Sequence, residues 1–287
     1  MPSLVSAIVP VITLPIYSRT LSVSEYGIYA LCIAFATFVS GLSNMGLTTG
    51  YERNFFEQKN PVQHGQLLFS VVLFVIGAYI LFGIPVFFLK KVLSKWIIGD
   101  PSYGTGILLA YGAVSLSSLK SYFLLYFRNM GNAKSYAWFS IDEIILNVLI
   151  SIILVVYYKM GINGLLIGQL AGASTVMILL LMRFHTTLPF GLSSAMMKKC
   201  FAISLPLTPR IFFGVIGTQF DKYLIGLLSS LGGVGLYNLG QKIAYVVFNY
   251  MTALQNVFSP KVYRMMFDKG QNGEHQPIPN ILFLTST

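Results

Sequence analysis

The sequence predicts an all-α protein, a polytopic bundle of about eight transmembrane helices. Of its 287 residues, 55% are hydrophobic and only 10% are charged, whereas a soluble domain carries about 25% charged residues. Three runs contain no Asp, Glu, Lys or Arg, namely residues 27–50, 67–89 and 162–182. Each run reaches the roughly 20 residues that a helix needs to cross a hydrocarbon core about 30 Å thick. Helices are expected because lipid offers the backbone no hydrogen-bond partner.

The boundaries of the eight spans follow from the apolar runs. In chain order they cover about residues 4–17, 27–50, 67–89, 104–127, 138–158, 162–182, 201–227 and 236–258. The first span is short and contains Pro10 and Pro15. A polar stretch follows the eighth span, and residues 278–287 resemble the opening of a ninth.

The basic residues of the connecting loops predict the orientation. The even-numbered loops hold ten Lys and Arg residues: Arg53, Lys59, Arg128, Lys134, Arg183, Lys198, Lys199, Lys261, Arg264 and Lys269. The odd-numbered loops hold five: Arg19, Lys90, Lys91, Lys95 and Lys159. The more basic loops are expected on the cytoplasmic side, which places the N-terminus there too, in the cytoplasmic (inner) membrane. Because the net charge of +10 resides mostly in these short loops, nucleic acid is not an expected partner.

A short internal repeat suggests how the spans are organised. Gly27-Ile28-Tyr29 opens the second span and Gly235-Leu236-Tyr237 opens the eighth. A separation of six spans preserves orientation, so the two halves would be parallel repeats, as in many transporters. We therefore expect a first lobe of six helices over residues 1–185. Residues 198–287 would begin a second lobe with two helices, a polar tail and the start of a ninth span.

One group of charged residues lies near the expected cytoplasmic end of two consecutive spans. Lys120 is late in the fourth span, and Asp142 and Glu143 are early in the fifth. A charge at bilayer depth costs a few kcal/mol unless it has a partner or an aqueous cavity. The three residues are therefore interpreted either as a structural ion pair or as a gate at the cytoplasmic mouth.

A second group points to anion binding deeper in the membrane. Arg210 lies near the midplane of the seventh span, just after two prolines that are expected to break the helix. A guanidinium facing a cavity there would attract phosphate; alternatively, Arg210 bonds carbonyls freed by the prolines. Asp221 lies about three helical turns further on and could share the face of Arg210, or could pair with Lys242 in the eighth span.

The sequence offers no sign of catalysis. It contains no Walker-type phosphate loop and no pairing of a nucleophile with a base. The histidines are scattered in loops, and no Cys or His spacing suggests a metal site: His64, His185 and His275. We therefore predict a protein that is not an enzyme and needs no metal or cofactor.

Several ordered motifs resemble Wzx-type polysaccharide-biosynthesis flippases, the O-antigen and capsule branch of the multidrug/oligosaccharidyl-lipid/polysaccharide exporter superfamily. The motifs are PIYSRTLS at 15–22, EYGIY at 25–29, NMGL at 44–47, RNFF at 53–56, LPL at 205–207, DKYLIG at 221–226, GLY at 235–237 and FSP at 258–260. Members of this family usually have twelve or more spans. The resemblance therefore implies a member that is shortened at the C-terminus.

The resemblance implies a flippase that moves a polyprenyl-diphosphate-linked oligosaccharide across the cytoplasmic membrane for surface polysaccharide or lipopolysaccharide assembly. Its diphosphate would bind cationic residues, Arg210 first and Lys242 second, with Asp221 beside them. The partners would be this substrate, the lipid bilayer and polysaccharide polymerase machinery. Two alternatives stay open: a cation-coupled exporter of small amphipathic compounds, and a truncated fragment that does not transport.

Overall fold

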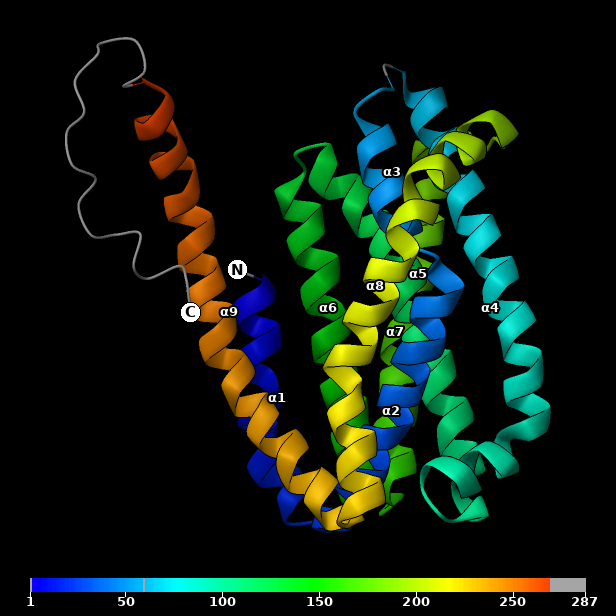
Figure 1. Cartoon of the computed structure of the whole chain (residues 1–287), viewed down its shortest axis with the longest axis vertical. Helices are drawn as coiled ribbons and strands as arrows, with labels where there is room; N and C mark the ends of the chain where they lie inside the picture. Colours follow the sequence, from blue (N-terminus) through cyan, green and yellow to red (C-terminus); the bar gives the residue numbers. More distant parts are fainter. Residues whose placement is uncertain (1, 59, 269–287) are drawn as a thin grey trace.

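The computed structural model describes residues 2–58 and 60–268, and all the regular structure in them is helical (Figure 1). The long helices are α1 (Pro2–Ser18), α2 (Val23–Asn44), α4 (Pro61–Ile97), α5 (Gly104–Asn129), α6 (Ala133–Ile152), α7 (Gly161–Thr187), α8 (Ser194–Leu228) and α9 (Leu231–Asp268). Shorter elements are α3 (Leu47–Phe55), the 3-10 turn η1 (Pro101–Tyr103) and the π-helical turn η2 (Ile153–Tyr157). The all-α polytopic bundle is confirmed.

Six helical segments among the described residues are long and apolar enough to cross a membrane: Val23–Asn44, Pro61–Ile97, Pro101–Asn129, Ala133–Tyr157, Gly161–His185 and Ser194–Leu228. The apolar part of α1 is shorter, at Ile8–Ser18. Helix α9 corresponds to the eighth expected span and is 38 residues long. The end of the polar tail and the expected ninth span lie outside the described residues.

The second expected span is not one helix, which corrects the reading of residues 27–50 as a continuous segment. Helix α2 ends at Asn44, and α3 begins at Leu47. Between them Met45 and Gly46 both have left-handed backbone conformations, with φ of 47° and 67°. This conformation cannot continue a right-handed helix, and glycine adopts it without steric cost. An uncharged run therefore contains a break that its hydropathy does not reveal.

The start of α2 is fixed by a capping box. The Ser22 hydroxyl accepts a hydrogen bond from the Glu25 backbone N–H at 3.2 Å, and the Glu25 carboxylate accepts one from the Ser22 N–H at 2.8 Å. Two backbone donors that the helix leaves unpaired are thereby satisfied. The cap sets where α2 begins, and hence the register of its inward-facing residues.

Replacing this cap gives a first test of the fold. Ser22→Ala should lower the free energy of unfolding by about 1 kcal/mol, whereas Ser22→Gly should cost only a few tenths. Denaturant titration of the purified protein in detergent would measure both values. Equal losses from the two variants would contradict a capping role for Ser22.

Glycines bring α6 and α7 close together. An added Cβ at Gly168 would overlap Ser151, and one at Gly172 would lie 3.0 Å from the Asn147 backbone nitrogen. Gly164 meets Leu154 in the same way, at 3.1 Å from its carbonyl carbon. Small residues at intervals of four allow the close backbone approach on which helix packing in lipid depends. The close packing of α6 on α7 fixes the positions of Asn147 and Ser151, which contact these glycines.

Two further glycines produce a reciprocal contact between α2 and α9. A Cβ added at Gly27 would overlap the carbonyl oxygen of Leu231, and one added at Gly235 would overlap that of Val23. Each glycine therefore meets the residue four positions before the other, and both equivalent pairs are 208 residues apart (235 − 27 and 231 − 23). Such a contact has the form of a two-fold axis. It supports the parallel repeat, while the division into lobes at residues 185 and 198 remains a prediction.

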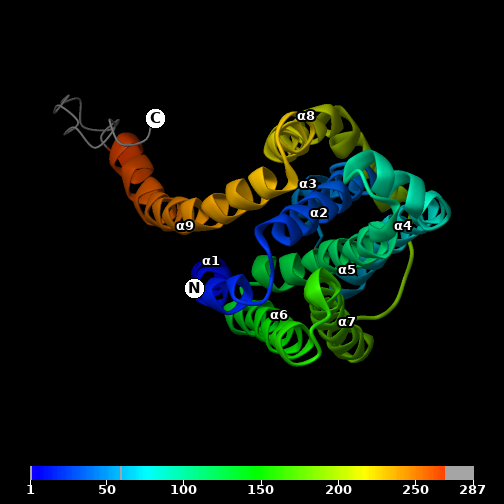
Figure 2. The same ribbon diagram turned by 90° about the horizontal axis from the view of Figure 1, so that it is seen from below.

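The remaining helices frame the α2–α9 contact. Helix α8 lies against α2 and α3, and α9 contacts α1, α2 and α8. From its start at the α8–α9 turn, α9 leans away from the rest of the bundle (Figures 1 and 2). The helices α1, α2, α6 and α7 face α9 from within the bundle. The space that they surround together with α9 contains the candidate site.

Candidate functional site

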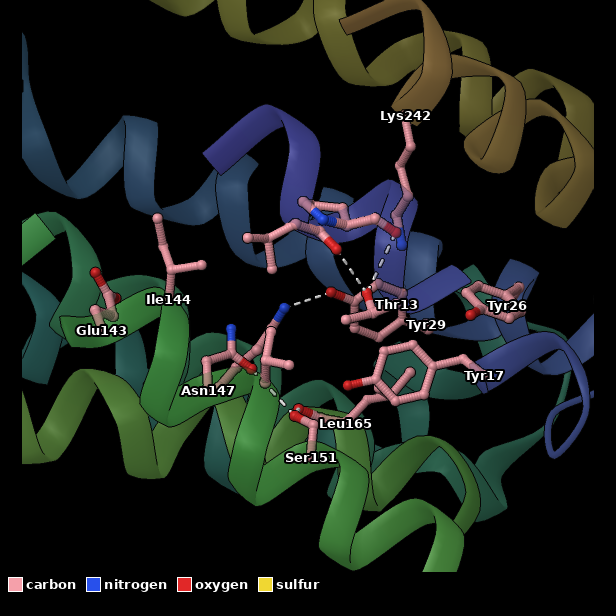
Figure 3. Close-up of a pocket in the computed structure, with 14 residues that line it drawn as sticks. Thr13, Tyr17, Tyr26, Tyr29, Glu143, Ile144, Asn147, Ser151, Leu165 and Lys242 are labelled. Atoms are coloured by element: carbon pink, nitrogen blue, oxygen red, sulfur yellow. Dashed lines mark hydrogen bonds between the residues drawn. The ribbon is translucent and has the colours of Figure 1, made fainter. Parts of the chain in front are cut away.

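A cavity of about 310 Å³ lies between α1, α2, α6, α7 and α9 (Figure 3). Its lining combines aromatic, amide and hydroxyl side chains with two charged residues, Glu143 and Lys242. The lining residues are Val9, Pro10, Thr13, Tyr17, Tyr26, Tyr29, Glu143, Ile144, Asn147, Val148, Ser151, Leu165, Gln169 and Lys242. Polar groups of this density within an apolar bundle are typical of a binding site.

Lys242 is the basic residue of this cavity. Its side chain extends from α9 towards Thr13 and Tyr29 (Figure 3). The ammonium nitrogen lies 5.2 Å from the ring centroid of Tyr26 and 5.6 Å from that of Tyr29. These are cation–π distances, which stabilise a desolvated cation without neutralising it. The ion pairs found in the described part of the chain join other residues, so the positive charge of Lys242 remains available to an anion.

Within the part of the chain that the structure describes, two buried donors near Lys242 have no hydrogen-bond partner. The Tyr26 hydroxyl belongs to a side chain that is 1% exposed, and the Asn238 amide nitrogen to one that is 7% exposed. Asn238 lies one helical turn before Lys242 on α9, so both project from one face. A buried donor left unpaired costs about 1–3 kcal/mol. Tyr26 lines the cavity, and its hydroxyl is buried without a partner among the described residues.

The opposite wall is held in place by hydrogen bonds. The Ser151 hydroxyl donates to Asn147 Oδ1 at 3.1 Å, and the Gln169 amide donates to the Tyr29 hydroxyl. After Ile152, the last residue of α6, the chain forms the π-helical turn η2, in which the Tyr158 N–H donates to the Ile153 carbonyl five residues back. A π-turn changes the helix register locally and is frequent at functional sites. Here it begins two residues after Ser151, which lines the cavity.

The predicted ion pair is formed by Lys120 and Glu143. Their side chains are only 8% and 15% exposed, and the Ser117 hydroxyl also donates to Glu143, at 2.9 Å. Asp142 is half-buried and takes no part in this pair. Glu143 lies at the far margin of the cavity from Lys242 (Figure 3). The structure thus selects Glu143 as the partner of Lys120, and a gating role of the three residues stays a prediction.

The anticipated pair between Asp221 and Lys242 does not form. Asp221 instead accepts a hydrogen bond from the Tyr237 hydroxyl at 2.7 Å. Tyr237 belongs to the repeated Gly-x-Tyr tripeptide, and its bond joins the end of α8 to the start of α9. Lys242 lies five residues further along α9, on a side that faces the tyrosines of α2.

Arg210 lies outside the cavity. It is exposed on α8, whereas Thr208 and Val215 contact α2 or the Met45 carbonyl that follows it. Arg210 is rotated by about 200° from Thr208 around the helix axis. Helix α8 also runs without a break through both prolines, which corrects the expected interruption; transmembrane helices tolerate proline where neighbouring groups satisfy the freed carbonyls. Anion binding by Arg210 therefore rests on the sequence alone.

Several residues that line the cavity were not predicted from the sequence, because the residues next to them in the sequence do not indicate a binding site. They are Thr13, Tyr17, Tyr26, Tyr29, Asn147, Ser151 and Gln169, and Asn238, one helical turn before Lys242, was missed as well. One signal was available: Asn238 and Lys242 stand four residues apart, so a helix places them on one face. The described residues contain no group of three His, Cys, Asp or Glu side chains that could hold a metal ion.

Two solved structures have the same fold. A chain named "protein A" matches with a TM-score of 0.65 and 20% identity, over 91% of this chain and 63% of that one. The multidrug transporter DinF-BH, of the MATE type and solved as a complex, matches with a TM-score of 0.63 and 18% identity, over 90% of this chain and 62% of its own length. The chain thus spans somewhat less than two thirds of both structures.

The family comparison is more specific than the fold. No protein of curated function matches the sequence significantly. The sequence model of one family, described as polysaccharide biosynthesis protein, matches residues 1–266, nearly the whole chain. This agrees with the resemblance carried by the ordered motifs and with a multi-pass helical bundle. The chain belongs to the polysaccharide biosynthesis protein family.

Proposed function

We propose that the protein is a flippase for a polyprenyl-diphosphate-linked oligosaccharide, used in the assembly of a surface polysaccharide such as O-antigen, capsule or lipopolysaccharide. One observation carries this proposal: Lys242 faces a cavity without a carboxylate partner, beside the unpaired donors of Tyr26 and Asn238. All three groups donate hydrogen bonds, so their natural ligand is an acceptor-rich anion such as a diphosphate. Membership of the family supports the same substrate class.

The rest of the cavity suits the remaining parts of this substrate. Tyr17, Tyr26 and Tyr29 offer ring faces and hydroxyls to the first sugar, and Asn147 and Gln169 offer amides. Helix α9 extends away from the other helices (Figure 2). The polyprenyl chain would remain in the lipid beside the bundle. We place the N-terminus in the cytoplasm and the protein in the inner membrane, on the loop charges. A polymerase that receives the flipped substrate would be its partner.

The competing function is cation-coupled export of small amphipathic compounds, and one structure of similar fold is a MATE multidrug transporter. A cation site is expected to present free carboxylates. Glu143 is the cavity's acidic residue, and it is already engaged by Lys120 and Ser117. The unneutralised charge in the cavity is therefore positive, which disfavours a cationic cargo.

Substitution of Lys242 tests the proposal. Lys242→Ala should abolish complementation of a flippase-deficient strain and weaken binding of undecaprenyl diphosphate to the purified protein by at least tenfold, because a hydrogen bond to a charged group contributes about 1.5–3 kcal/mol. Lys242→Arg should restore part of both. Lys134→Ala, which removes an exposed lysine, is the matched control. Tight diphosphate binding by Lys242→Ala would refute the role of Lys242. Arg210→Ala, measured alongside, tests the position that the sequence favours.

A further inference from the structure

A second hollow, of about 350 Å³, lies between α2, α3 and α8. Its lining holds four hydroxyl groups and one amide, and none of the described residues that form it is charged. It consists of Thr37, Ser40, Gly41, Asn44, Gly46, Thr48, Thr49, Ile211 and Val215. Uncharged polar groups gathered at membrane depth are unusual, since each must be satisfied by the protein, by water or by a ligand.

The break in α2 forms this hollow, and local hydrogen bonds hold its shape. The Thr208 hydroxyl donates to the Met45 carbonyl at 3.0 Å, which ties α8 to the break. Asn44 donates to the Thr48 hydroxyl at 3.1 Å and accepts from the Tyr122 hydroxyl. Non-helical backbone in a membrane protein is found where it lines a cavity or is buried in protein. The break is thus anchored on two sides, and the hollow is preformed.

The hollow shares one face of α2 with the cavity of Lys242. Tyr26 and Tyr29 line the first cavity, and Thr37, Ser40 and Asn44 line the second. These positions are separated by intervals of three, eight, three and four residues, which keep them within a sector of about 80° on the helix surface. Eleven residues from Tyr29 to Ser40 amount to about 16 Å along the axis. An elongated ligand lying on this face would contact both hollows.

We propose that this second hollow binds sugar residues of the lipid-linked oligosaccharide at a distance from its diphosphate. The inference rests on the proposed function and assigns the diphosphate and the distant sugars of the substrate to different sites. The described residues of the lining include no cation to attract phosphate and no anion to attract a cationic cargo. Hydroxyls and amides that both donate and accept match the hydroxyls of a neutral sugar. A separation of about 16 Å along α2 leaves the first sugars in the tyrosine cavity and brings those further from the diphosphate to the hollow.

Thr37 and Thr175 provide a matched pair of substitutions to test this division. Both hydroxyls donate to the carbonyl four residues earlier in a helix, at 2.8 Å for Thr37 and 2.9 Å for Thr175. Thr37 lines the hollow, while Thr175 is exposed on α7. Thr37→Leu should fill the hollow and weaken binding of lipid-linked oligosaccharide, extracted from the source cells, by about tenfold. Binding of sugar-free undecaprenyl diphosphate should change by less than twofold.

The controls separate this inference from the proposed function. Thr175→Leu should leave the binding of both lipids unchanged, and Thr49→Leu, at an exposed position of the lining, should repeat the selective loss with little risk to folding. If both hollow variants bind the oligosaccharide lipid as tightly as the unchanged protein, the sugar site is refuted. Equal weakening for both lipids would also refute it. If the unchanged protein binds neither lipid, the proposed function itself fails.

Discussion

Lys120→Met is expected to destabilise the folded protein by about 3–5 kcal/mol, because it leaves the Glu143 carboxylate buried without its counter-ion. The side chains of both residues are almost entirely enclosed, and the Ser117 hydroxyl is the further polar contact of Glu143. One neutral hydrogen bond cannot replace the lost charge interaction. Glu143→Leu should lower the free energy of unfolding by a similar amount, because it leaves the Lys120 ammonium buried without its counter-ion.

The double variant Lys120→Met with Glu143→Leu distinguishes a charge effect from a packing effect. Removing both charges removes both desolvation penalties, so the double variant should be more stable than either single one. Unfolding in detergent, followed by circular dichroism against denaturant, would measure the three free energies. Additive losses would show that the two residues act through packing and not through their ion pair.

Gly27→Ala and Gly235→Ala are expected to force apart the starts of α2 and α9. At each site the new methyl group would overlap a backbone carbonyl, of Leu231 or of Val23, which cannot move aside as a flexible side chain does. Overpacking of this kind costs typically about 1–3 kcal/mol. Gly240→Ala serves as the control, since a Cβ there meets nothing within 4 Å.

A disulfide placed between the two helices would report their separation. A Cβ at Gly232 would lie 3.8 Å from the Ser24 hydroxyl, so Ser24→Cys combined with Gly232→Cys should cross-link readily. The native Cys32 and Cys200 are buried and free. Adding Gly27→Ala should slow this cross-linking several-fold, and adding Gly240→Ala should not. Unchanged rates with Gly27→Ala would show that the glycine contact does not hold the helices together.

The fold was largely predictable because each long helix follows from a local property, namely an apolar run bounded by polar residues. The break at Met45 and Gly46 was not predictable in this way, since hydropathy does not report whether the backbone adopts a left-handed conformation. The continuity of α8 through its two prolines was misjudged for a related reason. Proline removes backbone hydrogen bonds, but whether the helix then ends depends on its neighbours in the bundle.

Only the charged residues of the candidate site could be predicted from the sequence. The cost of a charge in lipid singled out Lys120, Glu143 and Lys242, and the first two do meet. Polar and aromatic residues such as Tyr26 and Gln169 carry no such penalty at the level of sequence. Their convergence depends on packing between α2, α7 and α9, which a single sequence does not encode locally. The same limit applies to Arg210, whose depth could be read from its position but whose direction could not.

The reciprocal glycines also bear on how firmly the two helices are joined. Because a carbonyl oxygen occupies the place where a side chain would start, each glycine directs a Cα hydrogen at that oxygen, a weak bond of about 0.5–1 kcal/mol. Both together amount to about 1–2 kcal/mol, less than many single hydrogen bonds to a charged group. Lys242 stands about two turns beyond Gly235 on the same helix. An anion bound at Lys242 would therefore act close to this contact, which the packing of the other α2 and α9 residues also stabilises.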